Sequence, residues 1–220
     1  MRPPPNAEAH APIDQEPYSA RELFEHRIAW AERYGAHHQE AGASGVPHES
    51  LIAVVGGVAI AAGEHTLTTG LVQNFAEERS GYSIIGGDAI FEASAQSPEP
   101  RGAVAATNTF LAVSGADFII EYESSHGGRG PNDAWASSEL DYVAIDINGW
   151  SPRASPVVIE LHQLGHHFQP CEHQPPQDNN AYVMALAEAH GADSLSATQT
   201  NALTVENQFS FVNAIAVVAV

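Results

Sequence analysis

Lysine is absent from this chain, and its absence decides the balance of charge. The 220 residues carry eight basic side chains, all arginine, against 27 acidic ones, for a formal net charge of −19. Such a polyanion repels phosphate backbones and anionic lipid surfaces, so the composition argues against nucleic-acid binding. No apolar run reaches the ~18 residues that a membrane-spanning helix needs, and we therefore expect no membrane insertion.

Cysteine is nearly absent as well. Cys171 is the one cysteine, and it has no partner for a disulfide within the chain. The first 18 residues contain five prolines and no apolar segment of the kind found in cleaved secretory signals. The sequence also lacks a Gly-x-Ser-x-Gly elbow and a phosphate-binding loop, so the catalytic residues of any enzyme activity stay unknown.

The composition divides the chain into residues 1–49 and residues 50–220. The first part begins with a flexible, proline-rich leader and continues into an amphipathic helix over residues 19–35. Ser19 and Glu22 have the spacing of a capping box, and Gly35 suits the position after the last helical residue. The apolar face of this helix predicts docking, either within the chain, in self-association or on another partner.

Residues 50–220 have the pattern of a β-rich domain. Short apolar segments are bounded by Gly, Pro, Ser or Asn, and some alternate strictly, as in Phe118, Ile120 and Tyr122. We predict a mainly β fold, an antiparallel β-sandwich or barrel. One later helix is expected over residues 179–191, and the final residues, 201–220, have the pattern of a long strand.

Histidine gathers in the segment from residue 159 to residue 173. Its centre, "HQLGH", resembles the HExxH signature of zinc peptidases, in which a glutamate serves as the general base. Gln163 occupies the glutamate position and is no base, and the β-branched residues before His162 predict a strand rather than the required helix. The segment is therefore not expected to be a peptidase site.

A metal site without catalysis fits the same segment better. Neutral imidazole and thiolate are ligands for Zn²⁺ and other transition metals. A solvated loop is the competing interpretation, because the spacing matches no defined four-ligand framework. The candidate ligands are His162, His166, His167, Cys171 and His173.

Acidic residues offer two weaker candidates. The glycine-rich loop at residues 126–135 predicts either a hairpin turn or a calcium site, in which Asp133 would act together with Glu121 or Glu123. Further along, Asp141 and Asp146 are five positions apart, so a regular strand would place them on opposite faces. For these two carboxylates we expect sheet-surface or turn positions.

The last thirty residues, "GADSLSATQTNALTVENQFSFVNAIAVVAV", resemble the C-terminal secretion region of substrates of bacterial type I secretion. The resemblance lies in composition: no lysine, many small apolar residues, Ser, Thr and Asn, and an apolar end. It implies export without a cleaved signal. The chain departs from well-known members of that group because it lacks their glycine- and aspartate-rich calcium repeats. A plain terminal strand is the alternative interpretation.

Two functional hypotheses follow. The first is a non-enzymatic, acidic, extracellular or cell-surface structural or binding protein, with a metal in the His/Cys loop as an added feature; a cytoplasmic location is the alternative. The second is a β-barrel enzyme that acts on a small molecule through histidine or carboxylate acid–base groups. A cavity lined by titratable residues would favour the enzyme, and a filled apolar core would favour the binding protein.

Overall fold

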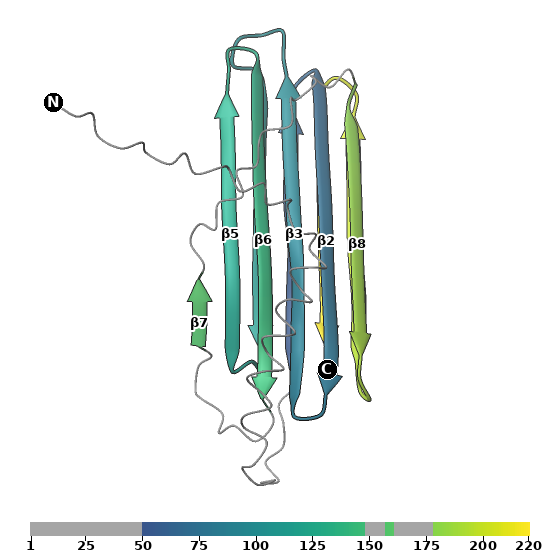
Figure 1. Cartoon of the computed structure of the whole chain (residues 1–220). Helices are drawn as coiled ribbons and strands as arrows, with labels where there is room; N and C mark the ends of the chain where they lie inside the picture. The colour runs from purple at the N-terminus through teal and green to yellow at the C-terminus, as the bar shows by residue number, and fades with distance from the viewer. Residues whose placement is uncertain (1–49, 148–156, 161–177) are drawn as a thin grey trace, which may run out of the picture.

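The computed structural model describes residues 50–147, 157–160 and 178–220, and these residues form a mainly β structure of two stacked sheets. Figure 1 shows the larger sheet in front and the smaller one behind it. The described strands are β1 (Ile52–Ala62), β2 (His65–Arg79), β3 (Tyr82–Gln96), β4 (Val104–Ser114), β5 (Phe118–Arg129), β6 (Asp133–Ile147), β7 (Val157–Glu160), β8 (Asn180–His190), β9 (Leu195–Val205) and β10 (Phe209–Ala219).

The smaller sheet has four strands in the order β4-β1-β10-β9, and the larger has six in the order β7-β5-β6-β3-β2-β8. Neighbouring strands are antiparallel except in two pairs, β2 with β8 and β5 with β7. Within the described residues neither sheet closes on itself. The sandwich form of the fold prediction is therefore confirmed, and the barrel form is wrong.

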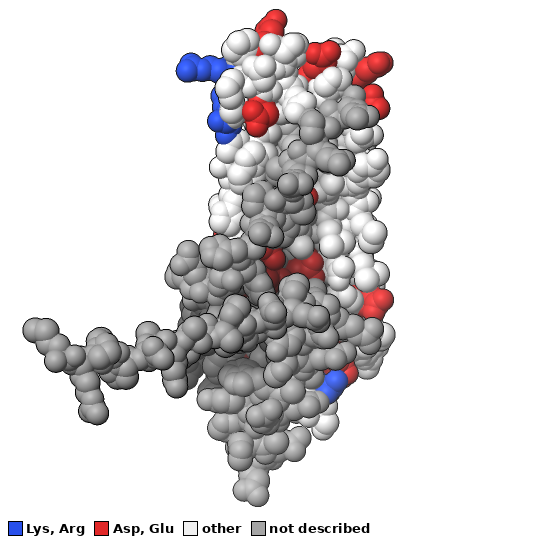
Figure 2. All heavy atoms as spheres, turned by 45° about the horizontal axis from the view of Figure 1, so that its top comes forward, with Lys and Arg blue, Asp and Glu red and all other residues white. Residues whose placement is uncertain are grey.

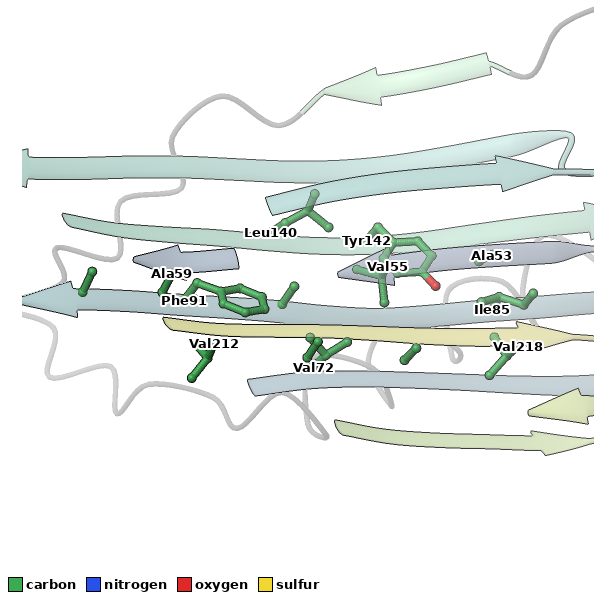
Figure 3. Close-up of a cluster of buried hydrophobic side chains, with 14 of the residues drawn as sticks. Ala53, Val55, Ala59, Val72, Ile85, Phe91, Leu140, Tyr142, Val212 and Val218 are labelled. Atoms are coloured by element: carbon green, nitrogen blue, oxygen red, sulfur yellow. The ribbon is translucent and has the colours of Figure 1, made fainter. Parts of the chain in front are cut away.

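Small side chains fill much of the space between the sheets. β1 packs against β3, β10 against β2 and β4 against β6. Many of the buried residues are alanine or valine, as Figure 3 shows around Phe91. Phe91 and Tyr142 are the largest buried side chains of this cluster. A Cβ added at Gly57 would lie 2.4 Å from the Phe91 ring, and one added at Gly70 would lie 2.7 Å from it. The two glycines therefore make the slot that the ring occupies.

A buried polar bridge connects the two sheets. Tyr142 on β6 donates its hydroxyl hydrogen to the side-chain oxygen of Asn74 on β2. The Asn74 amide in turn points at two carbonyls of the other sheet, 3.4 Å from that of Ala53 and 3.3 Å from that of Ala216. Both side chains are fully buried, so water cannot replace either hydrogen-bonding partner. Removing one of them would leave the polar group of the other without that hydrogen bond.

The later helix predicted over residues 179–191 is wrong, since this segment forms β8. Its alanines and Val183 face the other sheet, whereas Tyr182, Met184 and Leu186 face outward, a period of two. Ala, Leu, Met and Glu favour helices, but the parallel pairing with β2 and the burial of one face outweigh that propensity.

The expected long final strand is also wrong in part. Residues 195–219 make a hairpin, β9 and β10, joined by a turn in which Asn207 adopts a φ of 56°. Asparagine tolerates this left-handed conformation better than most residues. The predicted hairpin turn after β5 is confirmed between Arg129 and Asp133. The leader and the helix over residues 19–35 lie outside the described residues.

We predict that Tyr142→Phe lowers the free energy of unfolding by about 1–3 kcal/mol, because the buried Asn74 oxygen would lose its donor. Tyr182→Phe is the matched control: Tyr182 is 61% exposed, and its change should cost less than about 0.5 kcal/mol. Urea unfolding of both variants measures the difference. Equal effects would mean that the bridge adds nothing to stability.

Candidate functional site

The four-stranded sheet contains no charged residue. Each of its strands, β1, β4, β9 and β10, has 11 residues, and none of these is Asp, Glu, Lys, Arg or His. The chain as a whole carries a net charge of −19. The charges of the described strands therefore all lie in the six-stranded sheet, and one of the two outer surfaces of the sandwich is neutral.

The outer face of this sheet is apolar, and we call it the neutral face. Residues that pair side by side across the four strands form a row, and each row of this face contains one outward residue from each strand. One row consists of Asn108, Val58, Asn213 and Asn201, in which Asn201 donates to the Asn213 oxygen over 2.8 Å. Apart from Ser114 and Gln199, the other outward residues are apolar or glycine. The exposed large ones are Ile52, Ile60, Val104, Phe110, Leu195 and Leu203.

The apolar part of the neutral face is about as large as the largest apolar patches of ordinary monomers. Four strands about 4.8 Å apart, each of 11 residues at ~3.4 Å per residue, give a face of roughly 700 Å². The largest apolar patch on a typical monomer is about 300–600 Å² and often functional. The neutral face is therefore a candidate for binding another apolar surface.

The opposite surface carries carboxylates. In Figure 2, which views the side of the six-stranded sheet, acidic side chains gather at the near end of the sandwich and in the middle of the face. In the register of that sheet, Asp88 on β3 pairs directly with Asp141 on β6, and Gln73 on β2 flanks Asp88 on its other side. Glu139 is two residues from Asp141 and faces the same way.

Asp88 has a strongly perturbed carboxyl group. Only 5% of its surface is exposed. Burial raises its pKa from 3.8 to about 7, and the negative charges of Asp141 and Glu139 raise it further in the same direction. The Asp88 carboxyl can therefore bind and release a proton near neutral pH, unlike an ordinary surface aspartate.

The proposed metal ligands His162, His166, His167, Cys171 and His173 lie outside the described residues. Glu160, just before them, is the last residue of β7. In the part of the chain that the structure describes, no group of three or more His, Cys, Asp or Glu side chains is arranged to hold a metal ion.

The structure does not bring the suggested calcium ligands together. Asp133 is the first residue of β6, at the turn, whereas Glu123 pairs with Leu140 further along the same strand. Seven residues of strand separate these positions, roughly 24 Å at ~3.4 Å per residue. Glu121 is two residues farther still. The prediction of a calcium site from these residues is therefore wrong. Asp141 and Asp146 do lie on opposite faces, as expected.

Two features escaped the sequence analysis: the pairing of Asp88 with Asp141, and the segregation of charge between the sheets. The first depends on register between strands 53 residues apart, which the local sequence does not reveal. The second could have been noticed from the charge-free segments 52–62, 104–114, 195–205 and 209–219. Which of them share a sheet is not apparent without the fold.

Comparison of the chain with protein-family models, with curated proteins and with solved structures finds no match. Across the described ranges, no helix has the length and apolar character of a membrane span.

We predict that Asp88→Asn makes stability less dependent on pH. A raised pKa means that the folded state holds a proton between pH 4 and 7 that the unfolded state has released, so wild-type stability falls as pH rises through this window. Asparagine has no such proton. The variant should match the wild type near pH 4 and exceed it above pH 7 by on the order of 3 kcal/mol.

Urea unfolding at several pH values from 4 to 8 measures this difference. A gap between wild type and Asp88→Asn that stays constant with pH would contradict the account of Asp88.

Proposed function

We propose that the chain is a non-enzymatic structural or binding protein whose working surface is the neutral face. The observation that carries this proposal is that four complete strands of a highly acidic chain hold no charge, while their outward apolar side chains remain exposed. Leaving apolar surface in water is unfavourable by about 25 cal/mol per Å². A face of this size suits a role in which another surface covers it.

The interior of the sandwich supports this proposal over the enzyme alternative. Most side chains buried between the sheets are hydrophobic, such as Val55, Val72 and Leu140 (Figure 3), and the buried polar ones there are Thr, Ser and Asn, which are not acid–base groups. Asp88, the carboxyl group with the raised pKa, lies on the outer side of the six-stranded sheet, away from that interior. A mainly apolar core of this kind supports the binding protein over the enzyme.

An extracellular or cell-surface location is part of the proposal. It is supported by the acidic, lysine-free composition and by the resemblance of the last thirty residues to a type I secretion region. Most of those residues belong to β9 and β10, so they would serve the neutral face as well as export.

We predict that the dilute protein adsorbs to an octyl-coated surface through the neutral face. Ile60→Glu should weaken adsorption at least about tenfold, because its carboxylate would have to be desolvated at the apolar contact. Leu186→Glu is the matched control: the two residues are 42% and 40% exposed, but Leu186 lies on the six-stranded sheet. Surface plasmon resonance on the octyl layer measures both.

If Leu186→Glu reduced adsorption as much as Ile60→Glu, net charge rather than the neutral face would control binding. Failure of the wild type to adsorb would overturn the proposed function.

The His/Cys loop stays a prediction of its own. Protein purified without an affinity tag should contain near-stoichiometric Zn²⁺ or another transition metal, and the triple change of His166, His167 and Cys171 to alanine should remove it. Elemental analysis measures the metal, and thermal unfolding with and without a chelator measures its contribution to stability. Metal-free wild-type protein with an unchanged melting temperature would rule the site out.

A further inference from the structure

The neutral face has a size and pattern that suit a second copy of itself. We propose that two copies of the chain dock neutral face to neutral face, as a closed dimer with two-fold symmetry. This inference rests on the proposed function, because it identifies the surface that covers the face.

The area agrees with a stable dimer. About 700 Å² from each copy gives roughly 1,400 Å² of buried surface, and specific protein interfaces bury about 1,200–2,000 Å². Homodimer interfaces are also more apolar than other interfaces. A single open face of this kind favours a closed pair over an extended assembly, because after pairing no neutral face remains exposed.

The distribution of charge favours the same arrangement. Each copy is strongly acidic, so most contacts between two copies would bring like charges together. Docking through the neutral faces makes a four-layer structure with the charged sheets outermost. Three sheet spacings of about 10 Å then separate the two charged sheets by roughly 30 Å, several times the Debye length of about 8 Å at physiological salt.

One orientation brings Asn108 and Asn201 of different copies together. In the strand order β4-β1-β10-β9, a two-fold axis parallel to the strands places β4 of one copy over β9 of the other and β1 over β10, with rows matched. Asn108 then faces Asn201 of the other copy, so two amides meet, whereas Asn213 faces Val58. In the next row Ala106 faces Leu203, a small side chain against a large one.

A two-fold axis across the strands is the alternative. It would reverse the order of the rows, so that Asn108 faces Phe110 and Asn201 faces Gln199 of the other copy. The parallel axis places Asn108 against an amide and leaves Gln199 opposite Phe110. The two orientations therefore differ in whether Asn108 of one copy lies against Asn201 of the other.

Sedimentation equilibrium of the full chain tests the dimer. The wild type should have twice the chain's mass at micromolar concentration. Leu203→Glu should weaken association by ~100-fold, because two carboxylates would have to be desolvated in the interface. Leu186→Glu is the control. It makes the same change at an exposed position on β8, the edge strand of the other sheet, and should leave association unchanged.

Cross-linking tests the orientation. Asn108→Cys combined with Asn201→Cys, in a Cys171→Ser background, should be linked between copies by a short bis-maleimide. Within one copy these positions lie on the two edge strands, three strand spacings or about 14 Å apart, so the short reagent cannot join them there. Asn108→Cys alone should give no cross-linked dimer.

A wild type that stays monomeric at all concentrations would overturn the dimer, as would a dimer that Leu203→Glu leaves intact. A monomer that still adsorbs to the octyl surface through Ile60, or binds neutral phosphatidylcholine vesicles, would retain the proposed function while excluding the second copy as its partner. Loss of both dimer and adsorption would reject the two proposals together.

Discussion

The Phe91 ring lies between Gly57 of one sheet and Gly70 of the other, and a Cβ atom at either glycine would overlap it. The two sheets therefore lie close together, and the packing of the other inward side chains depends on this short separation. Alanine-rich inner faces bring the layers together along most of their length, and the few larger side chains then need matching gaps. The same proximity allows Asn74 to reach carbonyls of the opposite sheet while it holds the Tyr142 hydroxyl. Packing and the polar bridge therefore depend on one another.

The outer faces of the two sheets differ in charge. The six-stranded sheet carries carboxylates on its outer side, and the pKa of the buried one, Asp88, is raised to about 7 by burial and by neighbouring acids. The four-stranded sheet presents Ile60, Phe110 and other apolar side chains without a single charge. This difference between the two outer faces is the basis of the proposed function, in which the neutral face binds another apolar surface.

Much of the fold could be predicted from local sequence, because alternation and turn residues act over short distances. The strands around Phe118 and the turn before Asp133 are examples. The segment around Met184 has the composition of a helix but forms strand β8, because it pairs with β2, a strand over 100 residues away. The candidate sites depend still more on such pairings: neither the Asp88–Asp141 contact nor the neutral face exists until distant strands are placed side by side. The histidine and cysteine ligands lie outside the described residues.

Hydroxyl-radical footprinting at increasing protein concentration tests whether the protein associates through the neutral face, because it reports the solvent exposure of individual side chains on both faces. The account predicts that Phe110 and Leu203 become protected from oxidation as concentration rises, while Tyr182 and Met184 on the six-stranded sheet remain equally reactive. Protection of Tyr182 and Met184 instead, or no change on either face, would contradict the assignment of the neutral face as the surface through which this protein acts.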